Sequence, residues 1–187
     1  MTVRGPETRA SRAFCPADGE WTAIRFKLGT FMPQYPVASL LDHNDKNFPA
    51  ASARTFWLNG EQWEFPAFDN AESFVARLAG AGLIRRDEAV EAALLGDGRA
   101  LSQRSVQRHF REATGMTQST FRQIERARHA TTLLKDGMSI LDTVVAAGYF
   151  DQAHLTRSLK RFVGQTPSDI VRAIEQLSFL YKTTPVG

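Results

Sequence analysis

Cysteine is almost absent from this sequence, which has one, Cys15, among 187 residues. A single thiol cannot form a disulfide within the chain or supply a zinc site built from several cysteines. The sequence also lacks any apolar run near the ~18 residues that a membrane-spanning helix needs. Residues 1–20 lack the apolar core of a secretory signal. We therefore predict a cytoplasmic protein that does not interact with a membrane.

Patterns typical of catalysis or metal binding are missing as well. There is no Gly-rich phosphate loop, no ordered set of Ser, His and Asp, and no pair of carboxylates that stands out. The histidines are not spaced with a cysteine or a carboxylate as metal ligands are; they are His43, His109, His129 and His154. Cys15 has no activating basic neighbour. We predict no enzyme activity, no cofactor and no metal.

Charge is unevenly divided along the chain. The net charge is +3 and the pI is near 9.3. Residues 99–187 contain 13 basic and 7 acidic side chains, whereas residues 1–98 contain 10 and 13. A basic C-terminal half favours a polyanionic partner for that half. The acidic N-terminal half has no basic stripe, so we expect residues 1–86 to be dispensable for contact with such a partner.

The N-terminal part of the chain shows features of short strands. Residues 21–28 alternate apolar and polar side chains, which predicts a strand. Asn59-Gly60 suits a two-residue hairpin turn, because both residue types tolerate positive φ. This turn sets a register in which one face is apolar, formed by Phe56, Leu58, Trp63 and Phe65.

From residue 70 onward the apolar residues recur with a helical period. Residues suited to cap helix N-termini precede the apolar stretches except the one at 87–95; they are Asn70, Ser102, Thr117, Ser139, Asp151 and Thr166. Glycines follow several of the stretches and predict helix ends at Gly115, Gly148 and Gly164. The expected helices cover 71–80, 87–95, 103–114, 118–134, 140–147 and 152–163, with a last helix from Pro167 that buries Ile170, Val171, Ile174 and Leu177.

One segment of the chain recurs 49 residues later. The identical pairs between residues 102–117 and 151–166 are Gln103 and Gln152, Arg108 and Arg157, Gly115 and Gly164, and Thr117 and Thr166. Similar pairs are Val106 and Leu155, Phe110 and Leu159, and Arg111 and Lys160. The repeat predicts two similar amphipathic helices separated by one long helix.

The outward faces of these two helices have the chemistry of a major-groove reader. The first face presents Gln103, Arg104, Gln107, Arg108 and Arg111, and the second presents Gln152, Ala153, Thr156, Arg157 and Lys160. Arg pairs with guanine, Gln pairs with adenine, and Ala or the Thr methyl contacts the methyl group of thymine. Residues 140–159 also have helix-turn-helix proportions. We therefore predict double-stranded DNA as the partner; the alternative is a helical bundle with a polar outer face.

Three stretches of the C-terminal half carry a distinctive pattern: Ser102-Gln-Arg-Ser-Val-Gln-Arg-His-Phe110, Arg126-Ala-Arg-His-Ala-Thr-Thr-Leu-Leu134 and Gly148-Tyr-Phe-Asp-Gln-Ala-His-Leu-Thr-Arg-Ser-Leu-Lys-Arg-Phe-Val-Gly-Gln-Thr-Pro167. Through these stretches, most strongly the last, residues 102–170 resemble the DNA-binding domain of the AraC/XylS transcriptional regulators. The resemblance implies two helix-turn-helix subdomains that enter successive major-groove segments. It places Arg104, Gln107 and Arg108 in one segment and Gln152, Ala153, Thr156 and Arg157 in the next.

The sequence departs from the family at two places. Leu95–Ser102 replaces much of the helix and tight turn that precede the first reading helix, so we expect Arg157 to contribute more to recognition than Arg108. Many members also carry an N-terminal sensing or dimerising barrel of about eight strands, whereas residues 14–66 offer only a few. This segment is a remnant, a partial barrel that a partner completes, or part of a longer chain.

The predicted fold is mainly α, with two helix-turn-helix subdomains joined by a long linker helix and preceded by a small β-rich segment. The layout is a flexible lead-in (1–20), a β-rich segment (21–69), a connecting helix and linker (70–86), the tandem helix-turn-helix domain (87–176) and an apolar tail (177–187). The predicted function is sequence-specific transcription regulation, and RNA polymerase and a small-molecule effector are open as further partners. The alternative is a protein–protein interaction module, with an apolar surface at 177–181 or on the hairpin.

Overall fold

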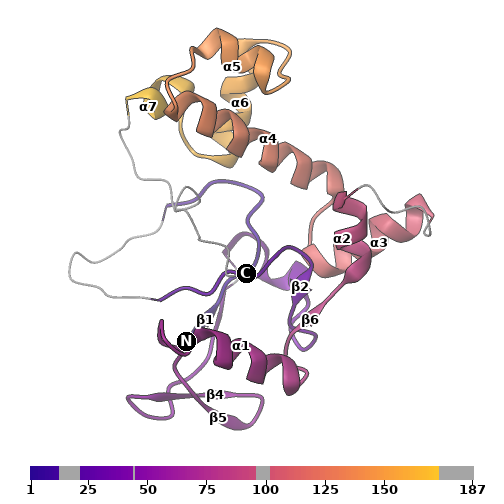
Figure 1. Ribbon diagram of the computed structural model, residues 1–187, viewed down its shortest axis with the longest axis vertical. Coiled ribbons are helices and arrows are strands. Elements are labelled where there is room, and N and C mark those ends of the chain that lie inside the picture. Colours follow the sequence, from indigo (N-terminus) through magenta and orange to yellow (C-terminus); the bar gives the residue numbers. More distant parts are fainter. Residues whose placement is uncertain (13–21, 44, 96–101, 173–187) are drawn as a thin grey trace. The chain divides into compact units, whose positions relative to one another are not determined.

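The computed structural model describes residues 1–12, 22–43, 45–95 and 102–172. The chain is mainly helical, with short strands in its N-terminal part, so the predicted fold class is confirmed. Its residues form two compact units. The first unit contains residues 1–7 and 13–118, and the second contains residues 8–12 and 119–187. Figure 1 shows the chain with the elements of both units labelled.

All strands of the first unit pair antiparallel and are short. The pairs are β1 (Thr2–Val3) with β3 (Lys46–Asn47), β2 (Thr30–Phe31) with β6 (Arg85–Arg86), and β4 (Thr55–Leu58) with β5 (Glu61–Glu64). A 3-10 segment, Val37–His43, lies between β2 and β3 in the sequence and is kinked at Leu41 and Asp42.

The β4–β5 hairpin has the predicted turn and register. Asn59 and Gly60 have φ values of 53° and 82°, and Phe56 pairs with Trp63. Both aromatic side chains are almost fully buried and pack with Phe74 of helix α1 (Ala71–Gly80). The apolar face of the hairpin therefore forms the core of the first unit and is not a free surface for a partner.

The strand predicted for residues 21–28 is wrong in the part that the structure describes. Residues 22–27 have no regular structure, and the Thr30 N–H donates to the Lys27 carbonyl across a turn. The alternating pattern fails because it defines no buried face: Phe26 is exposed, and Ile24 and Leu28 are only partly buried, Ile24 against the core.

The helices begin and end close to the predicted residues. Those after α1 are α2 (Glu88–Leu95), α3 (Gln103–Thr114), α4 (Gln118–Lys135), α5 (Ile140–Ala146), α6 (Gln152–Phe162) and α7 (Pro167–Val171). Side-chain capping is confirmed at Ser102, Ser139, Asp151 and Thr166. At Asn70 it is wrong, because the side-chain oxygen accepts from the Ala67 N–H instead.

The core of the second unit lies between α4, α5, α6 and α7. The last three helices gather around the C-terminal part of α4 (Figure 1). Leu155, Leu159 and Ala130 are fully buried there. The prediction that Val171 is buried is wrong, because α7 ends at this residue and leaves 55% of it exposed. Ile174, Leu177 and the predicted tail at 177–181 lie outside the described residues.

The two helices that the sequence predicts to read DNA belong to different compact units. Helix α3 lies in the first unit, where it packs against α2, β2 and the 3-10 segment, and α6 lies in the second. The DNA-binding region predicted for residues 87–176 thus includes parts of both units. Residues 30–43 provide packing for α3, a role that the charge of the N-terminal half does not indicate.

Candidate nucleic-acid interface

Helix α6 has one buried side and one exposed side. The Asp151 side chain accepts a hydrogen bond from the His154 N–H at 2.6 Å and so fixes the N-terminus of the helix. Leu155 and Leu159 anchor the buried side. The predicted reading residues lie elsewhere on the helix: Gln152, Ala153, Arg157 and Lys160 are exposed, and Thr156 is half-buried.

The Thr156 hydroxyl is committed to the backbone of its own helix. It donates to the Gln152 carbonyl at 2.8 Å. The methyl group is then the part of this side chain that remains for a contact with a ligand. Together with Ala153, it gives the first turns of α6 an apolar character between the polar ends of Gln152 and Arg157.

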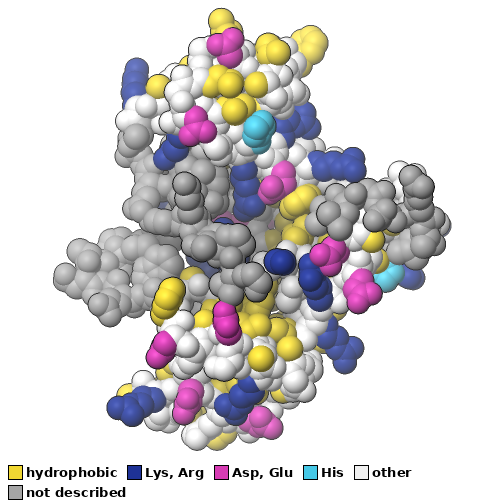
Figure 2. Space-filling model, in the orientation of Figure 1, with side chains coloured by type: hydrophobic (Ala, Val, Ile, Leu, Met, Phe, Trp, Pro, Cys, Tyr) yellow, Lys and Arg dark blue, Asp and Glu magenta, His cyan; other side chains and the backbone are white. Residues whose placement is uncertain are grey.

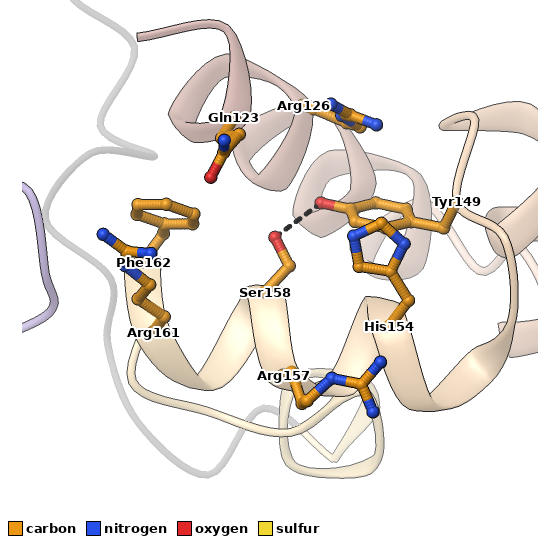
Figure 3. Close-up of a pocket in the computed structure, with 8 residues that line it drawn as sticks. All are labelled: Gln123, Arg126, Tyr149, His154, Arg157, Ser158, Arg161 and Phe162. Atoms are coloured by element: carbon orange, nitrogen blue, oxygen red, sulfur yellow. Dashed lines mark hydrogen bonds between the residues drawn. The ribbon is translucent and has the colours of Figure 1, made fainter. Parts of the chain in front are cut away.

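The turn between α5 and α6 is held by contacts from two helices. Tyr149 is buried in this turn, and its hydroxyl lies 2.9 Å from the Ser158 hydroxyl of α6. Arg126 of α4 donates to the Gly148 carbonyl at 3.2 Å, and its guanidinium lies 5.5 Å from the Tyr149 ring centre. Figure 3 shows Ser158 and His154 pointing toward Tyr149, whereas Arg157 extends from another side of α6. These contacts set the rotation of α6 that leaves Arg157 in solvent.

The Tyr149 hydroxyl is kept neutral by its surroundings. Burial raises its pKa above the ordinary value, and the hydrogen bond to Ser158 and the charge of Arg126 oppose that rise in part. A raised pKa means that the folded chain binds the proton more tightly than the unfolded chain. The contribution of this group to the free energy of unfolding is therefore present below the ordinary tyrosine pKa. It is lost as pH rises through the pKa that Tyr149 has in the folded chain.

We expect Tyr149→Phe to lower the free energy of unfolding by about 0.5–1.5 kcal/mol, the typical contribution of one hydrogen bond. The phenyl ring keeps the packing and the position beside Arg126, so the hydroxyl alone is tested. Urea unfolding of this variant, of Ser158→Ala and of the double variant measures the effect. The double variant should lose less than the sum of the two single losses. Fully additive losses would contradict the hydrogen bond.

Helix α3 is built in a similar way. The Ser102 hydroxyl accepts from the Ser105 N–H at 3.2 Å, and Gly115 ends the helix with φ 70°. Phe110 is fully buried on the inner side. All five predicted reading residues are exposed on the rest of the helix; they are Gln103, Arg104, Gln107, Arg108 and Arg111.

A second contact ties α3 to the helix before it. His109 Nδ1 lies 2.9 Å from Asp87 Oδ2. The other oxygen of Asp87 accepts from the Ala89 and Val90 N–H groups at 2.9 and 3.3 Å, at the start of α2. Asp87 therefore holds the first turn of α2 and the middle of α3 together.

The two tethers occupy the same place in the sequence repeat. His109 and Ser158 are 49 residues apart, and each joins its reading helix to the segment that precedes it. Asp87, Tyr149 and Arg126 were not among the site residues predicted from the sequence. One feature of the sequence could have indicated such partners. A polar residue recurs at positions 109 and 158, directly before the buried Phe110 and Leu159.

Each reading helix borders a hollow in the surface of its unit. A cavity of about 170 Å³ in the second unit is lined by Gln123, Arg126, Tyr149, His154, Arg157, Ser158, Arg161 and Phe162. A hollow of about 340 Å³ at the start of α3 is lined by Ser102, Arg104, Ser105 and Arg108. Basic side chains at both hollows make the surface suitable for phosphate groups.

The exposed arginines of both helices remain available for a ligand. Arg104, Arg108 and Arg157 form no ion pair with another residue in the described ranges. Helix α6 contains no acidic residue. The nearby Asp169 is engaged in the capping box of α7, where hydrogen bonds from Thr166 lower its pKa. The arrangement can offer guanidinium forks and amides to one polyanionic partner.

Residues 98–173 match the family model of a helix-turn-helix domain, which is of the AraC type. The matched family is a DNA-binding regulatory domain, and the match supports a DNA-binding transcription regulator. No curated protein and no solved structure matches the chain.

Two other kinds of site are absent from the described residues. None of the helices there is long and apolar enough to cross a membrane. In the same part of the chain, no three His, Cys, Asp or Glu side chains are grouped so that they could hold a metal ion.

Proposed function

We propose that this protein is a sequence-specific transcription regulator that reads two successive major-groove segments of double-stranded DNA with α3 and α6. The observation that supports it is the repeated helix: each copy exposes a Gln/Arg face and is tethered at the equivalent position, His109 or Ser158. A tether that fixes the rotation of a helix is what base reading requires, because a misplaced guanidinium loses its paired hydrogen bonds.

The roles of the exposed side chains follow from their chemistry. Arg104, Arg108 and Arg157 each offer a fork of N–H donors that fits the two acceptors of guanine. Gln103, Gln107 and Gln152 have an amide that pairs with adenine. Arg111 and Lys160 lie later on their helices, where contacts with phosphates fix the orientation on the duplex.

Selection of bound sites from random duplexes, followed by footprinting, tests this function directly. Two linked readers on one face of DNA enter grooves about one helical turn apart, so we expect two protected segments centred about 10 bp from each other. The full-length chain is used at fixed salt. Protection of a single segment would rule out reading by both helices, and failure to enrich any site would rule out sequence-specific binding.

Salt dependence separates DNA binding from the alternative of a protein–protein module. Phosphate contacts release counterions, so log K is expected to fall linearly with log salt with a slope of about −0.9 for each phosphate neutralised. We expect Lys160→Ala to reduce the magnitude of this slope by about one and to weaken all sequences equally. Gln107→Ala on α3 is the uncharged control. Retention on duplex that does not change with salt would contradict the proposal.

The alternative function is favoured by one apolar surface of the second unit. Leu141 and Val145 lie one turn apart on α5 and are 69% and 80% exposed. Figure 2 shows hydrophobic side chains on the surface over α5. Such a stripe suits contact with a second protein. It occupies a different helix from the Gln/Arg faces, so the two functions require different residues.

A further inference from the structure

Phe150 is a large apolar side chain that is not packed into the core of its unit. It directly precedes Asp151, the N-cap of α6, and is 90% exposed. An apolar residue at this place commonly packs on the fourth residue of the helix. That residue is Leu155, which is fully buried in the core of the second unit. Phe150 therefore does not pack against α6, the helix that it precedes.

Helix α6, which begins two residues after Phe150, exposes polar and basic side chains. Gln152, Arg157 and Lys160 are exposed on the same helix, which contains no acidic side chain. An aromatic residue at the start of a basic reading helix suits a partner that combines negative charge with apolar groups. In the major groove of DNA, the apolar group is the C5 methyl of thymine, which Ala, the Thr methyl and Phe contact.

Phe150 also lies next to the end of α6 that a reading helix brings to the bases. In helix-turn-helix proteins the N-terminal residues of the second helix contact the base edges. Phe150 lies three residues before Ala153, and the Thr156 hydroxyl is already bonded to the helix backbone. The first turns of α6 therefore carry apolar groups where the helix reaches the bases.

We infer that Phe150 is a specificity-determining residue that packs against the C5 methyl group of a thymine in the segment read by α6. This inference rests on the proposed function. The contact distinguishes thymine from uracil, which differs from thymine only by that methyl group. Burial of one methyl is worth about a fourfold change in affinity.

The test uses the full-length chain and the duplex obtained by site selection. Each thymine is replaced in turn by deoxyuridine, and the dissociation constant is measured by fluorescence anisotropy at fixed salt. At one position in the segment protected by α6, we expect uracil to weaken binding of the wild-type chain about fourfold. Phe150→Ala should weaken binding to the thymine duplex to a similar extent and make this position insensitive to uracil.

Two variants serve as controls for this experiment. Val145→Ala removes another exposed apolar side chain from the same unit and should keep the preference for thymine. Thr156→Ser removes only a methyl group and keeps the hydroxyl bond to Gln152. If Thr156→Ser abolishes the thymine preference and Phe150→Ala does not, the assignment to Phe150 is overturned.

The failure of this inference is distinguishable from failure of the proposed function. If no duplex is selected, sequence-specific binding itself is contradicted. If a site is selected and footprinted but wild-type chain tolerates uracil throughout the α6 segment, only the thymine contact is excluded. An unchanged thymine-to-uracil ratio in Phe150→Ala would likewise exclude it, and circular dichroism establishes that the variant is folded.

Discussion

Arg157→Ala is expected to lower affinity for the specific site by about 1–3 kcal/mol, the value of one bidentate Arg–guanine contact. This corresponds to a loss of roughly fivefold to 150-fold. Arg157 is exposed on α6 and forms no ion pair with other described residues, so its removal leaves no buried partner without a contact. Binding curves on specific and random duplexes at one salt concentration measure the effect.

Two further variants separate base reading from charge. Arg157→Lys keeps the positive charge but loses the planar fork, so it should restore non-specific affinity and not specificity. Arg108→Ala should have a smaller effect than Arg157→Ala. Helix α6 belongs to a complete helix-turn-helix with α5, whereas in front of α3 the stretch Leu95–Ser102 replaces much of the expected helix and tight turn. If Arg157→Ala leaves the ratio of specific to non-specific affinity unchanged while the chain stays folded, α6 is not the main reader.

Charge alone predicted that residues 1–86 are dispensable for DNA contact, but the packing of α3 leads to a different expectation: their deletion removes the contribution of α3 to DNA binding. The deletion takes away β2 and the 3-10 segment, against which α3 packs. Leu41 is one example, since its side chain lies 3.1 Å from the position that a Cβ on Gly115 would take. We expect the truncated chain to lose helix content by circular dichroism and to protect one DNA segment, not two.

A milder variant tests the same support in the full-length chain. Asp87→Ala removes the bonds to the start of α2 and to His109. We expect a loss of about 0.5–2 kcal/mol in stability, the range for a lost helix cap. Glu91→Ala, which removes from α2 a solvent-accessible side chain paired only with Arg86 in the described residues, is the control for loss of an acidic residue.

Full protection of both DNA segments by the chain that lacks residues 1–86 would show that those residues do not support α3.

The local structure around caps and turns could be predicted because the signal and the structure involve neighbouring residues. Asn59-Gly60 determines both the turn and the pairing of Phe56 with Trp63, since two positive φ values leave one hairpin register. Thr166 and Asp169 form the predicted capping box for the same reason. The exposed Gln/Arg faces also followed from the helical period, because buried anchors such as Leu155 leave the other positions in solvent.

The strand expected at residues 21–28 shows where this reasoning stops. An alternating pattern makes a strand only if a neighbouring strand and a core accept it, and Phe26 finds no such place. Val171 likewise satisfies the helical period but lies where α7 ends. In both cases the burial of a side chain depended on residues distant in the sequence.

The sequence by itself determined the two repeated helices α3 and α6, their ends and their outward chemistry, because these depend on contacts within a few residues. Only the tertiary structure decided how each helix is rotated and which part of the chain supports it. The contact between His109 and Asp87 spans 22 residues, and Arg126 holds Gly148 from an equal separation in the sequence. Such pairs have no periodic signal, since they form only when separate helices pack together.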